Sequence, residues 1–401
     1  MNLSTQDKPF YILFVIFAII ELIERSYIQI PSLAIFTACG LYYWIFLSIR
    51  YAIQTNLSLN FNATGIIKLL LIWNIIIIIR GILDSQDYWD YKSILFNKGP
   101  YLLFPFSIFL ISKINLLKKL IQFLLKYYLF LSIIIMRPIF WANTGRIISN
   151  LLPLLFFFTN KYKFYLLAFV FISLPFTWEA RGWIIRAILG ISLSLMVILR
   201  IKNSLKIYLM KFFYIICIFA PLSFVYLGYT GKFNVFAMDQ YITVENKEDI
   251  IDTRSFLYEL VDKKLSSEDK KWIGLGGISN YWDNYSENAK IASLRNKGRT
   301  STESGILNMY LYGGWIGAAL FSILFWISAF YGIFRSKNLI CKLTGCFIIC
   351  RWIVSFVDEP EIWLCSNLML YLFIGLCLNK RYREIPNSQW INFFKNLGKY
   401  D

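Results

Sequence analysis

The sequence of 401 residues contains no histidine. This absence excludes histidine as a general base, as a metal ligand and as a member of a Ser-His-Asp triad. A Walker loop and a dinucleotide-binding fingerprint are also lacking, so the chain itself is not expected to drive transport with a nucleotide. Charged residues make up only 16% of the chain, whereas soluble proteins carry about a quarter.

Cysteine is missing from the longest polar segment. All seven cysteines lie in or beside apolar runs, at Cys39, Cys217, Cys341, Cys346, Cys350, Cys365 and Cys377. The polar segment therefore has no predicted disulfide framework, and the cysteines are expected to be small buried hydrophobic residues.

Long apolar runs make up most of the sequence. Hydrophobic residues make up 58% of the chain and aromatic residues 19%. Runs that could span a bilayer cover residues 10–24, 28–49, 66–82, 100–112, 120–136, 147–159, 163–177, 183–199, 207–229, 306–334, 339–357 and 362–378. We predict an all-α polytopic membrane protein with about twelve transmembrane helices. The first run lacks a charged leader and a small-residue cleavage site, so we expect a retained helix.

The net charge of +17 is unequally divided between the two predicted sides of the membrane. With the N-terminus inside, the inner segments collect 21 basic residues and three acids, whereas the outer segments hold 20 basic residues and 21 acids. Positive charge is expected on the cytoplasmic side, which predicts N-in and C-in topology in a bacterial inner membrane. The excess of basic residues is therefore explained by topology and does not predict nucleic-acid binding.

The chain divides into four predicted parts. Residues 1–230 carry helices one to nine, 231–302 form a large outer loop, 303–380 carry helices ten to twelve, and 381–401 form a cytoplasmic tail. The loop holds 11 basic and 11 acidic residues. Within it, Asp252 or Thr253 can cap an amphipathic helix suited to lying on the bundle, and a glycine-rich turn follows. A loop of this length usually has a function.

Arginine is concentrated at the predicted outer ends of the helices. A guanidinium fork binds phosphate oxygens through two hydrogen bonds, which a lysine cannot do. We predict substrate binding by a set of these residues and by two loop aromatics that could stack on sugars: Arg80, Arg137, Arg146, Arg186, Arg299, Arg351, Tyr281 and Trp282. The alternative for each arginine is snorkelling or pairing with a nearby acid, and for the aromatics it is interfacial anchoring.

Carboxylates are scarce near the predicted membrane zone. Glu303, which opens the tenth helix, could accept the proton of an attacking sugar hydroxyl, or it could only place a favourable charge at a helix N-terminus. Two acidic groups could hold a divalent cation or form an acidic outer rim, one at Asp84, Asp87 and Asp90 and the other at Asp358, Glu359 and Glu361. We predict no metal and no cofactor.

Three short motifs, in this order, resemble the O-antigen polymerase (Wzy-type) family within the O-antigen ligase and polymerase group. Arg181-Gly182 begins a helix; Arg254 precedes an amphipathic helix and the Gly274-Leu275-Gly276-Gly277 turn; Glu303-Ser304-Gly305 precedes Gly313-Gly314-Trp315-Ile316-Gly317. The resemblance covers residues 145–380 and the overall topology. The sequence has Ala180 where the family has serine, and it lacks the Arg-x10-Gly spacing of some polymerases.

The resemblance implies metal-independent glycosyl transfer at the outer face of the inner membrane. Undecaprenyl-diphosphate-linked repeat units would be joined into O-antigen or capsule-type polysaccharide. Arg181, Arg254 and Glu303 would be catalytic, with Arg186 also on the diphosphate or sugar. The implied partners are the lipid-linked glycans, the bilayer and a chain-length regulator, with no nucleic acid.

Other functions stay open from the sequence. A flippase for lipid-linked oligosaccharides would also use arginines, although transporters tend to show repeat symmetry and polar residues at the membrane midplane. An O-antigen ligase would carry a functional histidine, which this chain lacks. A structural partner of a chain-length regulator is the remaining alternative.

Overall fold

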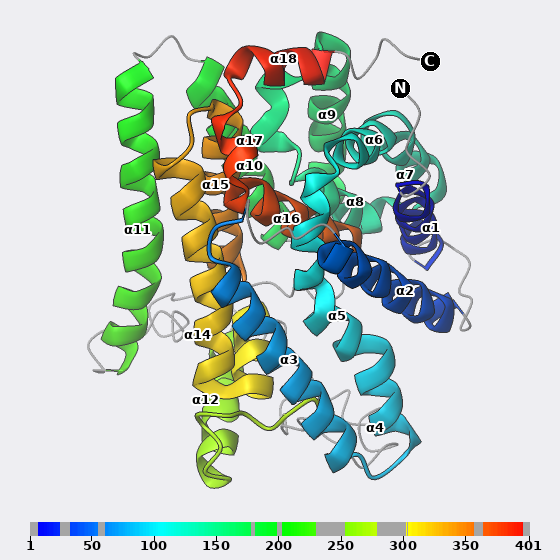
Figure 1. Cartoon of the computed structure of the whole chain (residues 1–401), viewed down its shortest axis with the longest axis vertical. Coiled ribbons are helices and arrows are strands. Elements are labelled where there is room, and N and C mark those ends of the chain that lie inside the picture. Colours follow the sequence, from blue (N-terminus) through cyan, green and yellow to red (C-terminus); the bar gives the residue numbers. More distant parts are fainter. Residues whose placement is uncertain are drawn as a thin grey trace, which may run out of the picture.

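The computed structural model describes residues 7–24, 33–54, 61–177, 181–198, 203–229, 253–278, 302, 304–356 and 364–395. Nearly all of these residues are helical, in agreement with the predicted all-α class. The helices form one bundle, with α11 at one edge and α1 and α2 at the other (Figure 1).

The longer helices are α1 (Lys8–Glu24), α2 (Leu33–Gln54), α3 (Thr64–Asp84), α6 (Ile114–Phe123), α9 (Asn160–Ser173), α10 (Arg181–Ile198), α11 (Asn203–Tyr229), α12 (Thr253–Ser267), α14 (Gly305–Phe334), α15 (Leu339–Val354) and α16 (Leu364–Leu378). The shorter ones are α4 (Tyr88–Lys92), α5 (Gly99–Leu103), α7 (Leu129–Ile135), α8 (Trp141–Ile148), α17 (Lys380–Glu384) and α18 (Asn387–Lys395). Turns of π-helix at Ser93–Lys98 and Leu124–Tyr128, and 3₁₀ turns at Phe104–Ser112, Pro138–Phe140, Leu152–Phe157 and Leu174–Phe176, join several of them.

Helix α3 shows why the bundle belongs in a membrane. One of its faces is buried, at Ile67, Leu70, Asn74, Ile77 and Gly81. An opposing stripe with the same three-and-four spacing is exposed, at Leu69, Ile72, Ile76, Ile79 and Leu83. A helix that is apolar on both faces is stable only where lipid replaces water on the outer one.

Five described helical segments are long and apolar enough to cross a membrane: Ile35–Ile53, Thr64–Asp84, Tyr88–Ile111, Ser204–Ser223 and Gly305–Phe334. Gly182–Val197 and Cys365–Leu378 are shorter apolar helices. The protein is therefore membrane-embedded in character. The segment that begins at Tyr88 starts twelve residues before the predicted run at 100, because polar α4 continues into the apolar stretch through a π-helical turn. The full number of spans and their orientation stay predictions.

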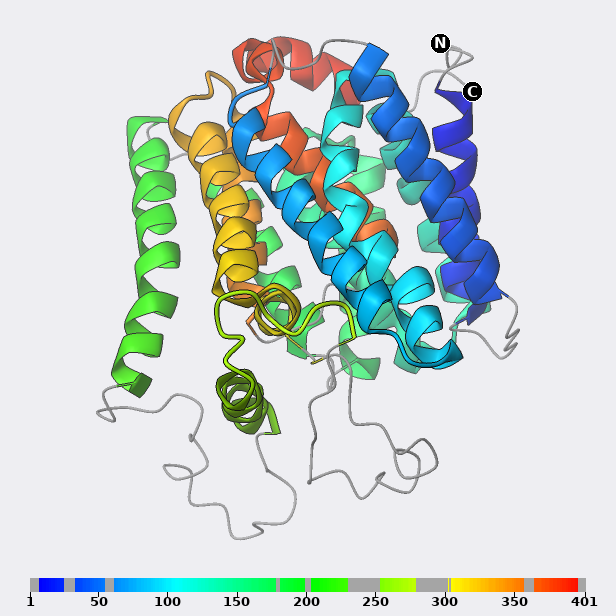
Figure 2. The same cartoon turned by 60° about the horizontal axis from the view of Figure 1, so that its bottom comes forward.

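Contacts between distant turns define two ends of the bundle. At one end, which we call the basic end, Lys113 lies 2.5 Å from Asp7, and the Lys337 amide donates to the Arg383 carbonyl over 2.9 Å. At the other, the loop end, the Gly276 amide donates to the Tyr312 carbonyl over 2.9 Å. Figure 2 shows α12 at the loop end and α18 at the opposite end.

Candidate functional site

Two of the predicted arginines line one small pocket near the loop end. Arg186 of α10 is 2% exposed and Arg351 of α15 is 4% exposed. The other lining residues are Tyr101, Phe321, Phe325, Ser355, Asn367, Leu370 and Tyr371, none of which is acidic. The cavity measures about 10 Å³, which is about enough for one water molecule. We call this site the arginine pocket.

Tight packing fixes the helices that carry the two arginines. On α10, Trp183 is fully buried, and a Cβ atom added at Gly145 of α8 would lie 2.5 Å from its ring. Further along, the Ser194 hydroxyl donates to the Leu152 carbonyl over 2.8 Å. On α15, the Trp352 indole donates to Ser322 Oγ of α14 over 3.0 Å. The two guanidinium groups are therefore set by a close-packed scaffold.

The chain on both sides of Glu303 is anchored next to the pocket. The Ser355 carbonyl accepts bonds of 3.0 Å from Ser304 Oγ and from the Ile306 amide. Asn308, which is fully buried, accepts from the Thr302 amide at 2.6 Å and donates back to the Thr302 carbonyl at 3.0 Å. Glu303 itself lies outside the described residues. Helix α14 begins at Gly305, two positions after Glu303, with Ser304 as its N-cap.

The predicted amphipathic helix of the outer loop is present as α12, and it reaches the same region. Val261 and Leu265 are fully buried, which confirms the predicted apolar face. The Tyr258 hydroxyl donates to the Phe356 carbonyl and bonds with Ser304 Oγ, both at 2.9 Å. Arg254 precedes Tyr258 by four residues, about one turn, in the same helix.

Helix α10 begins at Arg181, as the sequence predicts. Arg186 follows five residues later, about 7.5 Å along the helix axis. The segments that carry Arg181, Arg254 and Glu303 therefore meet around Ser304, Ser355 and the arginine pocket. The side chains of these three residues lie outside the described part of the structure, so their catalytic roles stay predictions.

Arg80 lies elsewhere at the loop end and holds the glycine-rich turn. Its Nη1 atom donates to the Ile273 carbonyl over 2.6 Å, and its Nη2 atom donates to the Gly274 carbonyl over 2.8 Å. Lys98, which is 4% exposed, donates to the Gly277 carbonyl over 2.8 Å and lies over the Tyr312 ring. The Arg80 guanidinium group, which was predicted to bind phosphate, therefore binds backbone carbonyl oxygens in this structure.

The glycine-rich turn fills a break in α14. The sequence predicts a continuous helix through 306–334, but Gly314 is non-helical, with φ 62° and ψ −161°. Backbone groups on both sides of the break bond with the turn and the residues before it. The Leu311 carbonyl accepts from the Leu275 amide at 2.8 Å, and the Trp315 amide donates to the Lys271 carbonyl at 2.9 Å. The turn thus satisfies backbone groups that the broken helix leaves open.

The Arg80→Lys variant should loosen this turn, because one ammonium group cannot reproduce two parallel bonds. We expect a loss of about 1–2 kcal/mol in local stability, and hence faster tryptic cleavage after Lys270 and Lys271 in detergent. The control is Arg50→Lys, an exposed arginine on α2. Equal cleavage rates in the two variants would show that the Arg80 fork does not hold the turn.

The remaining predicted residues are scattered. Arg146 lies beside the pocket, since its carbonyl accepts from the Ser366 hydroxyl over 3.0 Å and Asn367 is the next residue. Arg137 is exposed, in the turn after α7, and is not among the pocket residues. Arg299, Tyr281 and Trp282 lie outside the described residues.

Sequence reasoning missed the polar residues that complete the site. Tyr101, Asn367 and Tyr371 line the pocket, and Asn308 locks the start of α14. An asparagine inside an otherwise apolar run was the available signal, because a buried amide requires hydrogen-bond partners.

The first acidic group has a local role in the chain. Asp87 is the N-cap of α4 and accepts from the Trp89 and Asp90 amides, while Asp90 accepts from the Gln86 amide over 3.1 Å. Within the described ranges, no group of three or more acidic or cysteine side chains could hold a metal ion. The second acidic group, at 358–361, lies outside those ranges. Directly after α12, the pKa of Glu268 is lowered chiefly by its hydrogen bond to Lys264, 2.7 Å away.

No protein-family model matches this sequence, and no curated protein matches it at a significant level.

Proposed function

We propose that this chain joins undecaprenyl-diphosphate-linked oligosaccharide repeat units into a polysaccharide by glycosyl transfer at the outer face of a bacterial inner membrane. The supporting observation is the arginine pocket, where two buried guanidinium groups from different helices line one cavity with no acid among its described lining.

The chemistry of the transfer requires an anion site of this kind. When the bond between the donor sugar and its lipid diphosphate breaks, negative charge develops on the diphosphate oxygen. Fixed guanidinium groups in a water-poor site stabilise that charge without reorganising. Since the cavity holds about one water molecule at present, it must widen to admit a phosphate group.

We assign the other roles by their place in the chain. Arg181 precedes Arg186 on α10, and Arg254 lies about one turn before Tyr258 on α12, whose hydroxyl bonds with Ser304. These two arginines would bind the donor diphosphate or sugar. Glu303, between two residues anchored beside the pocket, would take the proton of the acceptor hydroxyl. The tyrosine and asparagine side chains of the pocket would bind sugar hydroxyls.

The deciding experiment incubates the purified protein with the undecaprenyl-diphosphate repeat unit of its host and separates the products on a gel. We expect a ladder of glycan lengths that survives EDTA, because the proposed site uses arginines and not a metal. Loss of the ladder with EDTA would assign the acidic groups to a metal. Absence of a ladder with an active substrate would contradict the proposal.

The Glu303→Gln variant should abolish polymer formation while leaving binding of the lipid-linked donor intact. The amide retains the shape of the side chain but cannot accept a proton, and loss of a general base costs about 10²–10⁴-fold in rate. The matched control is Glu268→Gln, an exposed loop position paired with Lys264. Continued ladder formation by Glu303→Gln would place the base elsewhere.

A flippase for the same lipid-linked glycans is the second candidate, and the break in α14 favours it. Broken helices at the bilayer midplane are common in transporters. Here the break follows the first residue of α14 by nine positions and lies at the loop end, where the backbone of the glycine-rich turn already fills it. Translocation into liposomes without lengthening of the glycan would favour this alternative.

A further inference from the structure

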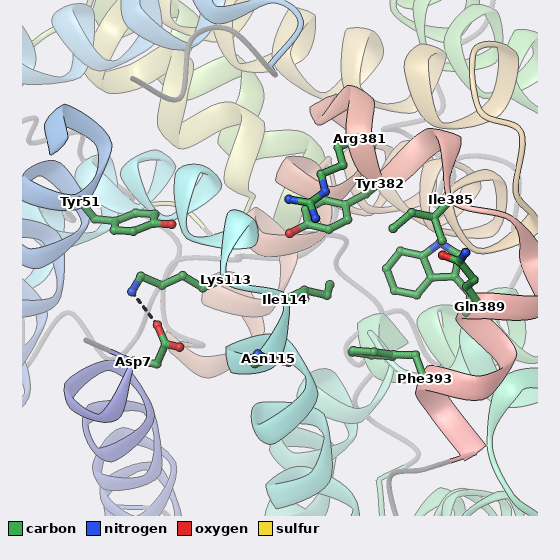
Figure 3. A pocket seen from close by; sticks show the side chains of 11 residues that line it. Asp7, Tyr51, Lys113, Ile114, Asn115, Arg381, Tyr382, Ile385, Gln389 and Phe393 are labelled. Atoms are coloured by element: carbon green, nitrogen blue, oxygen red, sulfur yellow. Dashed lines mark hydrogen bonds and ion pairs between the residues drawn. The ribbon is translucent and has the colours of Figure 1, made fainter. Parts of the chain in front are cut away.

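A second and larger pocket lies at the opposite end of the bundle. It has a volume of about 520 Å³ and lies between the start of α1, the turn before α6, and helices α17 and α18. Figure 3 shows Asp7, Tyr51 and Lys113 along one side and Arg381 and Tyr382 across from them. The proposed glycosyl transfer uses none of these residues. We call this site the basic-end pocket.

The charges of this pocket favour an anion. Lys113 and Asp7 pair at 2.5 Å and are both nearly buried, so their charges largely cancel. Lys113 also lies over the Tyr51 ring, 4.3 Å from its centroid. Arg381 carries the remaining charge: its side chain is exposed, and its guanidinium group donates to no oxygen within the described residues. A free guanidinium fork beside tyrosine hydroxyls is suited to phosphate oxygens.

The wall that continues from Arg381 and Tyr382 is mostly apolar, with Gln389 as its polar member. Ile114, Ile385 and Phe393 line it, together with Trp390, which is 2% exposed and packs on Phe394. A fully hydrated anion from the cytosol gains nothing from such a wall. A molecule with a phosphate group and an apolar body would use both halves of the pocket.

The position of the pocket also points to a lipid. Helix α18 lies across the basic end of the bundle (Figure 1), with Trp390 and Phe394 buried and Lys395 in its last turn. Lys337, Lys380 and Arg383 belong to neighbouring turns of the same end. Basic pockets between membrane helices on the positively charged side bind anionic lipid head groups.

We propose that the basic-end pocket binds the phosphate head group of an anionic glycerophospholipid from the adjacent leaflet. Arg381 binds the phosphate, the Tyr51 and Tyr382 hydroxyls donate to its oxygens, and the apolar wall receives the glycerol and the first acyl carbons. The site is separate from the proposed glycosyl transfer and does not depend on it.

The test places the full-length protein in nanodiscs of zwitterionic phosphatidylcholine and titrates phosphatidylglycerol into them at fixed salt. Native mass spectrometry counts the phosphatidylglycerol molecules retained by each chain. We expect at least one retained molecule in the wild type, and at least tenfold weaker retention in Arg381→Gln. Arg335→Gln, an exposed arginine at the end of α14 outside the pocket, is the matched control and should behave as the wild type.

Two further arms separate the possible ligands. Glycerol 3-phosphate, which lacks acyl chains, should not compete at millimolar concentration; full competition would assign the pocket to a soluble phosphate compound and overturn the proposal. Equal loss of lipid in Arg381→Gln and Arg335→Gln would show diffuse surface attraction and also overturn it. Both variants should form the same glycan ladder as the wild type. Because lipid retention is measured without the ladder assay, failure of the proposed polymerase function would not change the interpretation of the lipid result.

Discussion

Replacing Arg351 by lysine should lower the rate of polymer formation by about 10²–10³-fold, the usual effect of losing one donor that stabilises developing charge. Lysine keeps the positive charge but cannot form the two parallel bonds of a guanidinium fork. Arg351 shares its pocket with Arg186 and faces no acid among the described lining residues. The same substitution at Arg186 should have a comparable effect, and the ladder assay measures both.

Arg335→Lys is the control for general effects of the substitution, because Arg335 is exposed at the far end of the bundle. Thermal unfolding in detergent separates function from folding. If Arg351 is catalytic, its lysine variant should unfold near the wild-type temperature and still fail to lengthen glycan. A near-normal ladder from a folded Arg351→Lys protein would contradict the proposed diphosphate site.

Replacing Gly314 by alanine should destabilise the whole loop end. Gly314 has φ 62° and ψ −161°, a backbone conformation open essentially only to glycine, and an added Cβ would lie 2.3 Å from the Trp272 carbonyl. Backbone strain and overpacking together should cost about 2–6 kcal/mol. We expect a lower unfolding temperature and a lower yield of folded protein.

Gly65→Ala is the matched control. Gly65 lies in α3, and an added Cβ would meet no atom within 4 Å. Alanine there should leave stability unchanged or raise it by up to about 1 kcal/mol. Equal unfolding temperatures for the two variants would show that the glycine-rich turn is not packed into the break in α14.

The class of fold and part of the site could be predicted from the sequence because both depend on local pattern. Apolar runs predict α3 and α14, and the Arg181-Gly182 motif of the family resemblance predicts the start of α10. The amphipathic spacing of Val261 and Leu265 predicts the face of α12 that packs on the bundle. Each of these follows from residues within a few turns of one another.

Contacts between distant segments could not be predicted. A cluster of outer arginines looks uniform in the sequence, yet Arg186 and Arg351 share a pocket, whereas Arg80 binds the backbone of a turn almost two hundred positions away. The break in α14 depends on the same turn, because a Gly-Gly pair inside an apolar run continues as helix unless other backbone groups replace the lost bonds.

The start of α4 was missed because its residues are polar and the helix becomes apolar only after the π-helical turn.

The docking of the glycine-rich turn also has a consequence for biosynthesis. Two of its partners, Leu311 and Tyr312, are translated 36 residues after Leu275 and Gly276, whereas Ile77, the partner of Gly277, is made much earlier. At about 5–20 residues per second, the ribosome therefore needs several seconds to supply the second half of the binding surface. During this interval the turn can contact α3 and Lys98, which are made earlier, and it becomes fully bonded after α14 has been inserted. Closure of the loop end is thus a late step in the assembly of the protein.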